Sequence, residues 1–149
     1  MQINNGLYFL HEHPWSATSW NYRAMQDLVR RKGVRTIRGD MCTFDMRQED
    51  GRGIARIKKP TGFLTNSEMI AKQLSRRCTG GHRHIPLVGG RAKQAQIYPD
   101  KLCVAIITGL VEQMIKDERI TAGGIGSMVP DEKLEGDGQE FWDDLSGEA

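Results

Sequence analysis

A long helical repeat near the carboxyl end constrains the fold more than any other feature of this sequence. It follows Tyr98-Pro99 and covers residues 100–116. Apolar or small residues recur there every three or four positions: Leu102, Ala105, Ile106, Gly109, Leu110 and Met114. This spacing puts them on one face of an α-helix, so we expect the strongest helix of the chain in this segment.

Three short apolar runs upstream predict strands. They cover residues 7–11, 34–38 and 62–65, and each is bounded by Gly, Pro or polar residues. Short apolar runs of this kind are typical of buried strands. The stretches 41–57 and 78–92 are polar and contain Gly, so we expect them to be loops.

Two further helices are expected between these runs. The first would be capped by Ser19 or Asn21 and would end at Gly33. The second would begin at Asn66 or Ser67, because both side chains can accept a hydrogen bond from the first helical turn. The resulting order of strand, helix, strand, strand, helix, loop and helix indicates an α/β domain with a partial sheet.

In a doubly wound α/β fold the ligand site lies at the carboxyl ends of the strands. Glu12, Asp40 and Asn66 each follow a predicted strand, so we expect them at such ends. Polar residues commonly follow strands in any fold, and the pattern therefore favours a site there only weakly.

Charge divides the chain near residue 121. The last 29 residues carry eight Asp/Glu and one Lys, which leaves 20 Lys/Arg against 11 Asp/Glu in the rest, a balance of +9. We therefore expect a folded domain over residues 1–120 and an acidic flexible tail or linker over residues 121–149. The basic domain is compatible with binding of DNA or RNA, although surface charge also serves solubility.

Cysteine usage and hydropathy indicate an intracellular protein of the cytoplasm or nucleus. The three cysteines are odd in number and far apart, which argues against a disulfide framework. The amino-terminal residues do not form a signal peptide, and no apolar stretch approaches the roughly 20 residues of a membrane span. We expect no membrane partner.

A cluster of metal-ligand residue types lies in the second predicted loop. Cys78, His82 and His84 fall within seven residues, and Cys42 in the other long loop could be the fourth ligand. Two thiolates and two imidazoles form a zinc ligand set. The alternative is that the two histidines lie on a basic surface together with four arginines: Arg76, Arg77, Arg83 and Arg91.

Other polar residues are candidates for nucleotide contacts. Glu12 could hydrogen-bond a base edge or transfer a proton, but it could equally be a solvated loop residue. Lys58, Lys59 and Thr61 could hold phosphates, or they could form a solvated turn. Asn66 could bind a substrate, and helix capping explains it at least as well.

These motifs in their order resemble a known family. Residues 9–14, 40–44, 58–61 and 64–66, followed by Cys78 and His82-x-His84, are similar to cytosine-5 DNA methyltransferase-like domains of phages and copia-type retrotransposon polyproteins. Residues 141–147 resemble the spacer before the reverse transcriptase of such polyproteins.

The resemblance implies that residues 1–120 are the C-terminal half of a Rossmann-like, methyltransferase-like domain. The upstream half of that domain would be its partner in a full-length polyprotein and would bind S-adenosylmethionine. By the same resemblance, Glu12 would contact the target cytosine and the basic segment from Lys58 to Thr61 would hold its nucleotide. His13 and Asp45 depart from the Asn and Gly usual in the family.

The family's catalytic parts are absent from this sequence. No cysteine follows a proline, so none matches the nucleophile, and the Gly-rich cofactor loop is missing. Without both parts the reaction has no mechanism, and we expect the isolated chain to be inactive. The leading interpretation is thus an inactive polyprotein fragment. The alternatives are a small basic nucleic-acid-binding module stabilised by zinc, and a structural remnant without a ligand.

Overall fold

The computed structural model describes residues 2–88 and 93–121. The chain divides into two units, residues 1–119 and 120–149, and every described helix and strand belongs to the first unit. The acidic tail predicted over residues 121–149 lies outside the described residues except for Thr121.

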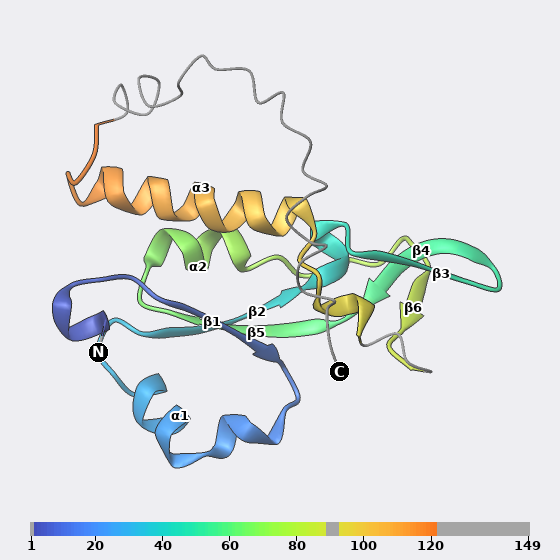
Figure 1. Cartoon of the computed structure of the whole chain (residues 1–149), viewed down its shortest axis with the longest axis horizontal. Coiled ribbons are helices and arrows are strands. Elements are labelled where there is room, and N and C mark those ends of the chain that lie inside the picture. Colours follow the sequence, from blue (N-terminus) through green and yellow to red (C-terminus); the bar gives the residue numbers. More distant parts are fainter. Residues whose placement is uncertain (1, 89–92, 122–149) are drawn as a thin grey trace, which may run out of the picture. The chain divides into compact units, whose positions relative to one another are not determined.

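The main sheet has three strands in the order β1-β5-β2, and all its pairs are antiparallel. These strands are β1 (Leu10–Pro14), β2 (Arg35–Asp40) and β5 (Pro60–Thr65), with β5 in the middle (Figure 1). Five consecutive residues of β5 are buried, which explains why its sequence is a short apolar run. All three strands predicted from the sequence are present, with shifted ends.

A second small sheet, in the order β3-β4-β6, occupies the two stretches that we expected to be loops. An antiparallel hairpin joins β3 (Arg47–Asp50) to β4 (Gly53–Lys58), and β6 (His84–Pro86) pairs with β4 in parallel. The loop prediction was wrong because these strands are largely polar. Only Ile57 and Ile85 among their residues are buried.

Three α-helices accompany the sheets. They are α1 (Arg23–Val29), α2 (Glu68–Leu74) and α3 (Asp100–Lys116), and the bounds of α3 agree with the helical repeat. Figure 1 shows α2 and α3 on one side of the main sheet and α1 on the other. Four short 3-10 helices complete the described elements: η1 (Gln2–Asn5), η2 (Thr18–Asn21), η3 (Met41–Phe44) and η4 (Gln94–Gln96).

The helix caps agree only in part with the sequence analysis. The Ser67 hydroxyl accepts a hydrogen bond from the amide of Ile70 at 3.2 Å, so the predicted cap of α2 is confirmed. The cap predicted for the first helix was wrong. Ser19 and Asn21 lie in η2, and Tyr22 precedes α1 without a side-chain cap.

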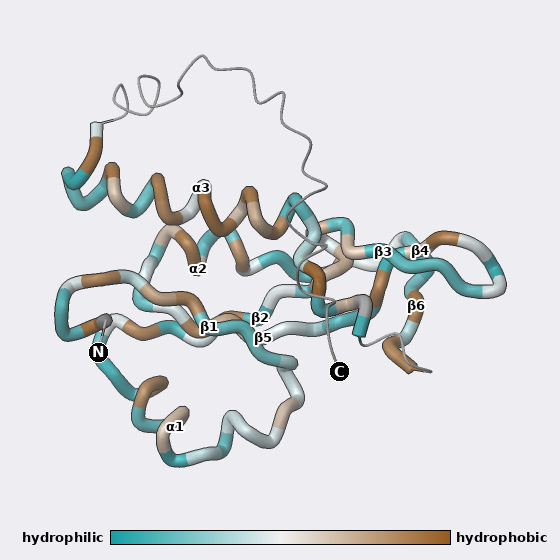
Figure 2. The backbone as a smooth tube through the Cα atoms, in the orientation of Figure 1, coloured by the Kyte–Doolittle hydropathy of each residue, from teal (hydrophilic) through white to brown (hydrophobic). Residues whose placement is uncertain are grey.

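The core lies between the main sheet and the two helices above it. Phe63 of β5 contacts a cluster that includes Leu74 of α2 and Leu102 of α3, all with no exposed surface. Hydrophobic residues recur along α3 turn after turn (Figure 2). The buried Gln113 adds a polar link, because its carbonyl oxygen accepts hydrogen bonds from the Ser67 hydroxyl and the Met69 amide.

The fold is therefore a mixed α/β arrangement, as expected. Its finer assignment to a Rossmann-like sheet is not confirmed, because the main sheet is antiparallel and the parallel pair β4–β6 belongs to the second sheet. No helix within residues 2–88 and 93–121 combines the length and apolar character that a membrane crossing needs.

We predict that Gly109→Ala destabilises the protein, although Ala favours helices over Gly by about 1 kcal/mol. An added Cβ would lie 2.7 Å from Cα and 2.9 Å from the nitrogen of Ile70, so α3 would be pushed from α2. Overpacking of this kind costs about 1–3 kcal/mol, and urea unfolding should show a net loss.

The matched control is Ile107→Ala on the same helix. Ile107 is 61% exposed, and its replacement should change the free energy of unfolding by less than about 0.5 kcal/mol. A Gly109→Ala variant more stable than the wild type would contradict the close helix contact.

Candidate metal centre

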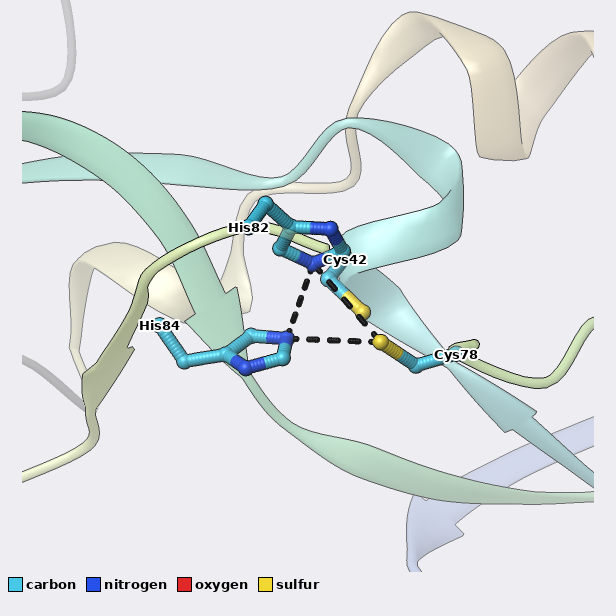
Figure 3. Close-up of side chains that lie close together, drawn as sticks. All are labelled: Cys42, Cys78, His82 and His84. Carbon is cyan, nitrogen blue, oxygen red and sulfur yellow. Dashed lines mark hydrogen bonds between the residues drawn. The ribbon is translucent and has the colours of Figure 1, made fainter. Parts of the chain in front are cut away.

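Four metal-ligand side chains converge from three separate segments. Cys42 lies in η3 directly after β2, Cys78 follows α2, and His82 and His84 lead into β6. Their ligand atoms all lie within 4.8 Å of one another (Figure 3). The structure thus brings together all four residues that the sequence analysis named, and the cluster could hold a metal ion.

The distances from Cys78 to the two histidines suit a tetrahedral ion. Zinc bonds of about 2.3 Å to sulfur and about 2.0 Å to nitrogen separate two such ligands by about 3.6 Å. The Cys78 sulfur lies 3.7 Å from Nε2 of His82 and 3.6 Å from Nε2 of His84. The two Nε2 atoms lie 2.9 Å apart, a hydrogen-bond distance, so one of them carries a proton that a metal ion would displace.

Two consecutive glycines turn the chain between the ligands. Gly80 and Gly81 have φ angles of +86° and +76°, a left-handed conformation that favours glycine. The turn lets His82 fold back towards Cys78, and the Gly80 amide points at the Cys78 sulfur, 3.4 Å away. An amide donor at this sulfur stabilises the thiolate that a metal requires.

Asp40 positions the loop that carries Cys78. Its carboxylate accepts hydrogen bonds from the Cys78 amide at 2.9 Å and from Arg77 Nε at 3.1 Å, and its own amide donates to the Arg76 carbonyl at 2.8 Å. Burial alone would raise the pKa of Asp40. The Cys78 hydrogen bond and the nearby Arg77 and Arg38 outweigh burial, so its pKa is lowered and it is ionised.

The protonation states of two ligands also follow from the surroundings. Burial, reinforced by Cys78 and Asp40, raises the pKa of the Cys42 thiol to about 11. Burial, together with the nearby His82 and Lys58, lowers the pKa of His84. A neutral imidazole is the form that binds metals, and a bound cation would displace the thiol proton of Cys42.

The alternative interpretation, two histidines on a basic surface, is met in part, because His82 and His84 both lie near arginines. His82 and His84 are half-buried and face each other, with ring centroids 4.4 Å apart. Of the arginines in that alternative, Arg76 stacks on Phe44 and Arg83 pairs with Asp50 at 2.7 Å. Arg91 lies outside the described residues.

Of the five residues expected to contact a nucleotide, Glu12, Lys59 and Thr61 lie together. Glu12 and Lys59 form an ion pair with each other, and Thr61 is buried. Glu12 forms an ion pair of 3.6 Å with Lys59 and accepts a hydrogen bond from the Tyr98 hydroxyl. Lys59 also donates to the Ala95 carbonyl at 3.0 Å. Thr61 has no exposed surface. Burial, with the charge of Glu12 next, raises the pKa of Tyr98 to about 12.

The other two residues lie apart from this group. Lys58 is exposed and lines a cavity beside the metal-ligand cluster. Asn66 bonds the segment before β1, since its side chain accepts from the Phe9 amide and donates to the Leu7 carbonyl. It is therefore a structural residue at that position, and the cap of α2 is Ser67.

The expectation that Glu12, Asp40 and Asn66 share one edge of the sheet was wrong. Glu12 lies in the middle of β1 and not at its end. Because β5 runs antiparallel to β2, Asp40 lies opposite Pro60 at one edge, whereas Asn66 follows Thr65 at the other. Antiparallel pairing separates the carboxyl ends of neighbouring strands.

Basic hollows that the sequence analysis missed lie on two sides of the cluster. One has a volume of about 320 Å³, and its lining includes Cys42, Cys78 and four cations: Arg38, Lys58, Lys59 and Arg77. The other, of about 570 Å³, is lined by His82 and three arginines: Arg47, Arg56 and Arg83. These side chains come from strands of both sheets and from the segments between elements, and of their grouping the sequence indicated only the adjacent pair Lys58 and Lys59.

No protein-family model, no curated protein and no solved structure matches this chain. The site is therefore interpreted from its own geometry.

We predict that His84→Ala removes the bound metal. Three remaining ligands hold a structural ion poorly, so metal content should fall from nearly one ion per chain to nearly none. The melting temperature should fall as well, because metal binding contributes directly to folding free energy. Metal analysis of protein purified without an affinity tag, and thermal unfolding with and without a chelator, provide the measurements.

A second variant, Cys78→Ser, should lose the metal in the same way. Cys103→Ser is its matched control. Cys103 lies in α3 outside the cluster and is half-buried like Cys78, so its replacement should leave metal content unchanged. Equal metal content in all variants would contradict the site, as would wild-type protein without metal when its cysteines are reduced.

Proposed function

We propose that the chain is a small nucleic-acid-binding module stabilised by a structural zinc ion. The observation that supports it best is the convergence of Cys42, Cys78, His82 and His84. Two cysteines and two histidines are the ligand set of structural zinc sites, and four protein ligands fill the tetrahedral coordination sphere. No position is then open for water or substrate, so the ion would hold the loops and take no part in chemistry.

The charge around the cluster supports nucleic acid as the partner. Two thiolates balance the charge of a zinc ion, so the metal adds no net charge at the site. Among the described residues that line the cavity beside it, Asp40 is the only acidic one, against four Lys or Arg. Groups of cations on a protein surface attract the phosphate backbone of DNA or RNA, with release of counterions.

The arrangement would place the metal ion and the cations in one site. Cys42 and Arg38 are close along the chain on the β2 side, and Cys78 and Arg77 are adjacent on the α2 side. A shared ion would hold these two sides of the cavity together. Metal removal should therefore loosen the phosphate-binding residues as well as the loop.

The resemblance to the C-terminal half of a cytosine-5 methyltransferase-like domain in a retrotransposon polyprotein stays a prediction. The contact between Glu12 and Lys59 groups two of its expected residues. The antiparallel order of the main sheet does not add support for a Rossmann-like half-domain. We propose no catalytic reaction and no S-adenosylmethionine site for this chain.

We predict that affinity for a fluorescent oligonucleotide falls steeply with salt. The logarithm of the binding constant should decrease linearly with the logarithm of the salt concentration, as counterion release requires. Lys58→Ala should reduce the slope by about 0.7 to 0.9, the loss of one phosphate contact. Fluorescence anisotropy measures both, and a chelator should weaken binding by the wild type.

Lys72→Ala is the matched control, because it removes the same charge from an exposed position of α2 that does not line the cavity. Its slope should equal that of the wild type. Affinity that does not vary with salt, or no binding at low salt, would contradict the proposed function.

A further inference from the structure

Two tryptophans lie against the face of the main sheet that α2 and α3 leave uncovered. Phe63 of β5 faces the core, so its neighbour Gly62 faces the opposite side. A Cβ at Gly62 would lie 2.6 Å from the ring of Trp20 and 3.3 Å from that of Trp15. Only a glycine at this central strand position lets both rings approach the sheet so closely.

The Trp20 ring is held in place by its neighbours. Its Nε1 donates to the Pro14 carbonyl at 2.9 Å, and the rings of His11 and His13 meet it edge to face at 5.9 and 5.8 Å. Ser19 and His13 share a hydrogen bond of 2.5 Å that ties η2 to β1. The Trp20 side of the aromatic surface is therefore pre-organised, which lowers the entropy cost of binding to it.

A hollow of about 470 Å³ opens beside these rings. It is lined by Trp15, Trp20, residues of η2 and α1, and Thr36 of β2, and its walls are more apolar than those of the basic hollows. Trp15 is 41% exposed and lines this hollow. An exposed indole beside a hollow offers a surface on which a flat ring can stack.

Arg38 connects this hollow to the cavity beside the metal-ligand cluster. It lies opposite Gly62 in the strand register, so it shares the face that the tryptophans cover. Its guanidinium carbon lies 5.8 Å from the centre of the Trp15 ring, and the same side chain lines the cavity with Lys58 and Arg77. The exposed ring of Trp15 and the cations of the cavity therefore lie next to each other, with Arg38 between them.

We propose that this face binds single-stranded nucleic acid, with an unpaired base in the hollow beside Trp15 and the backbone phosphates along Arg38, Lys58 and Arg77. This inference rests on the proposed function and specifies the form of its partner. Aromatic rings that stack bases, next to a track of cations, are the usual means of binding single strands. A duplex keeps its bases stacked inside and cannot place one in the hollow without unpairing it.

The experiment compares a fluorescent oligothymidine with a duplex of equal length at low salt. The single strand should bind more tightly, and Trp15→Ala should weaken its binding about tenfold or more while duplex binding changes little. Trp15→Phe keeps a stacking ring and should recover much of the loss. Ile107→Ala removes an exposed apolar side chain from α3 and should have no effect.

A second measurement does not depend on the folding of the Trp15→Ala variant. In a Trp142→Phe background the remaining tryptophans are Trp15 and Trp20, and their fluorescence should be quenched by the single strand and not by the duplex. Salt-dependent binding that is equal for both forms, with no quenching, would overturn this inference and leave the proposed function intact. No binding of either form would overturn both.

Discussion

Four ligand side chains from two distant parts of the chain, residue 42 and residues 78–84, meet at one point. Neither three-stranded sheet is large, and an isolated small sheet has little stability of its own. Cys42 leaves the main sheet at the end of β2, whereas His84 begins β6 of the second sheet. An ion at this point would link both sheets and the segment after α2, and it would contribute stability that the modest core does not supply.

The residues around the cluster share in this constraint. The buried carboxylate of Asp40 orients the backbone at Cys78 and pairs with Arg77. Outer contacts of this kind fix the orientation of metal ligands and tune their affinity. The same geometry places Arg38 and Arg77 at the cavity, so under the proposed function one arrangement of loops would serve both metal binding and the attraction of phosphate.

Some parts of the structure could be predicted because their signals are local. The repeat in α3, the Ser67 cap and the ligand types of the Cys78–His84 loop depend on residues only a few positions apart. The hairpin β3–β4 escaped prediction because its residues are mostly polar. Backbone pairing and contacts such as the ion pair between Arg83 and Asp50 support that sheet, and sequence periodicity does not report them.

The strand directions and the aromatic hollow depend on distant contacts. Whether β5 pairs parallel or antiparallel with β1 and β2 is decided by tertiary packing, so Glu12, Asp40 and Asn66 could not be placed from their local sequence. The role of Gly62 emerges only when Trp15 and Trp20 are seen against it. The metal-ligand cluster also joins distant residues, but it could be predicted because only a few residue types bind a metal ion.

X-ray absorption at the zinc edge tests the central claim most directly, because it reports the atoms bound to the ion. For protein loaded with a single zinc ion per chain, we expect two sulfur neighbours at about 2.3 Å and two nitrogen neighbours at about 2.0 Å. A first shell of oxygen and nitrogen alone, or one with a single sulfur, would contradict the four-ligand site and the structural role that we assign to it.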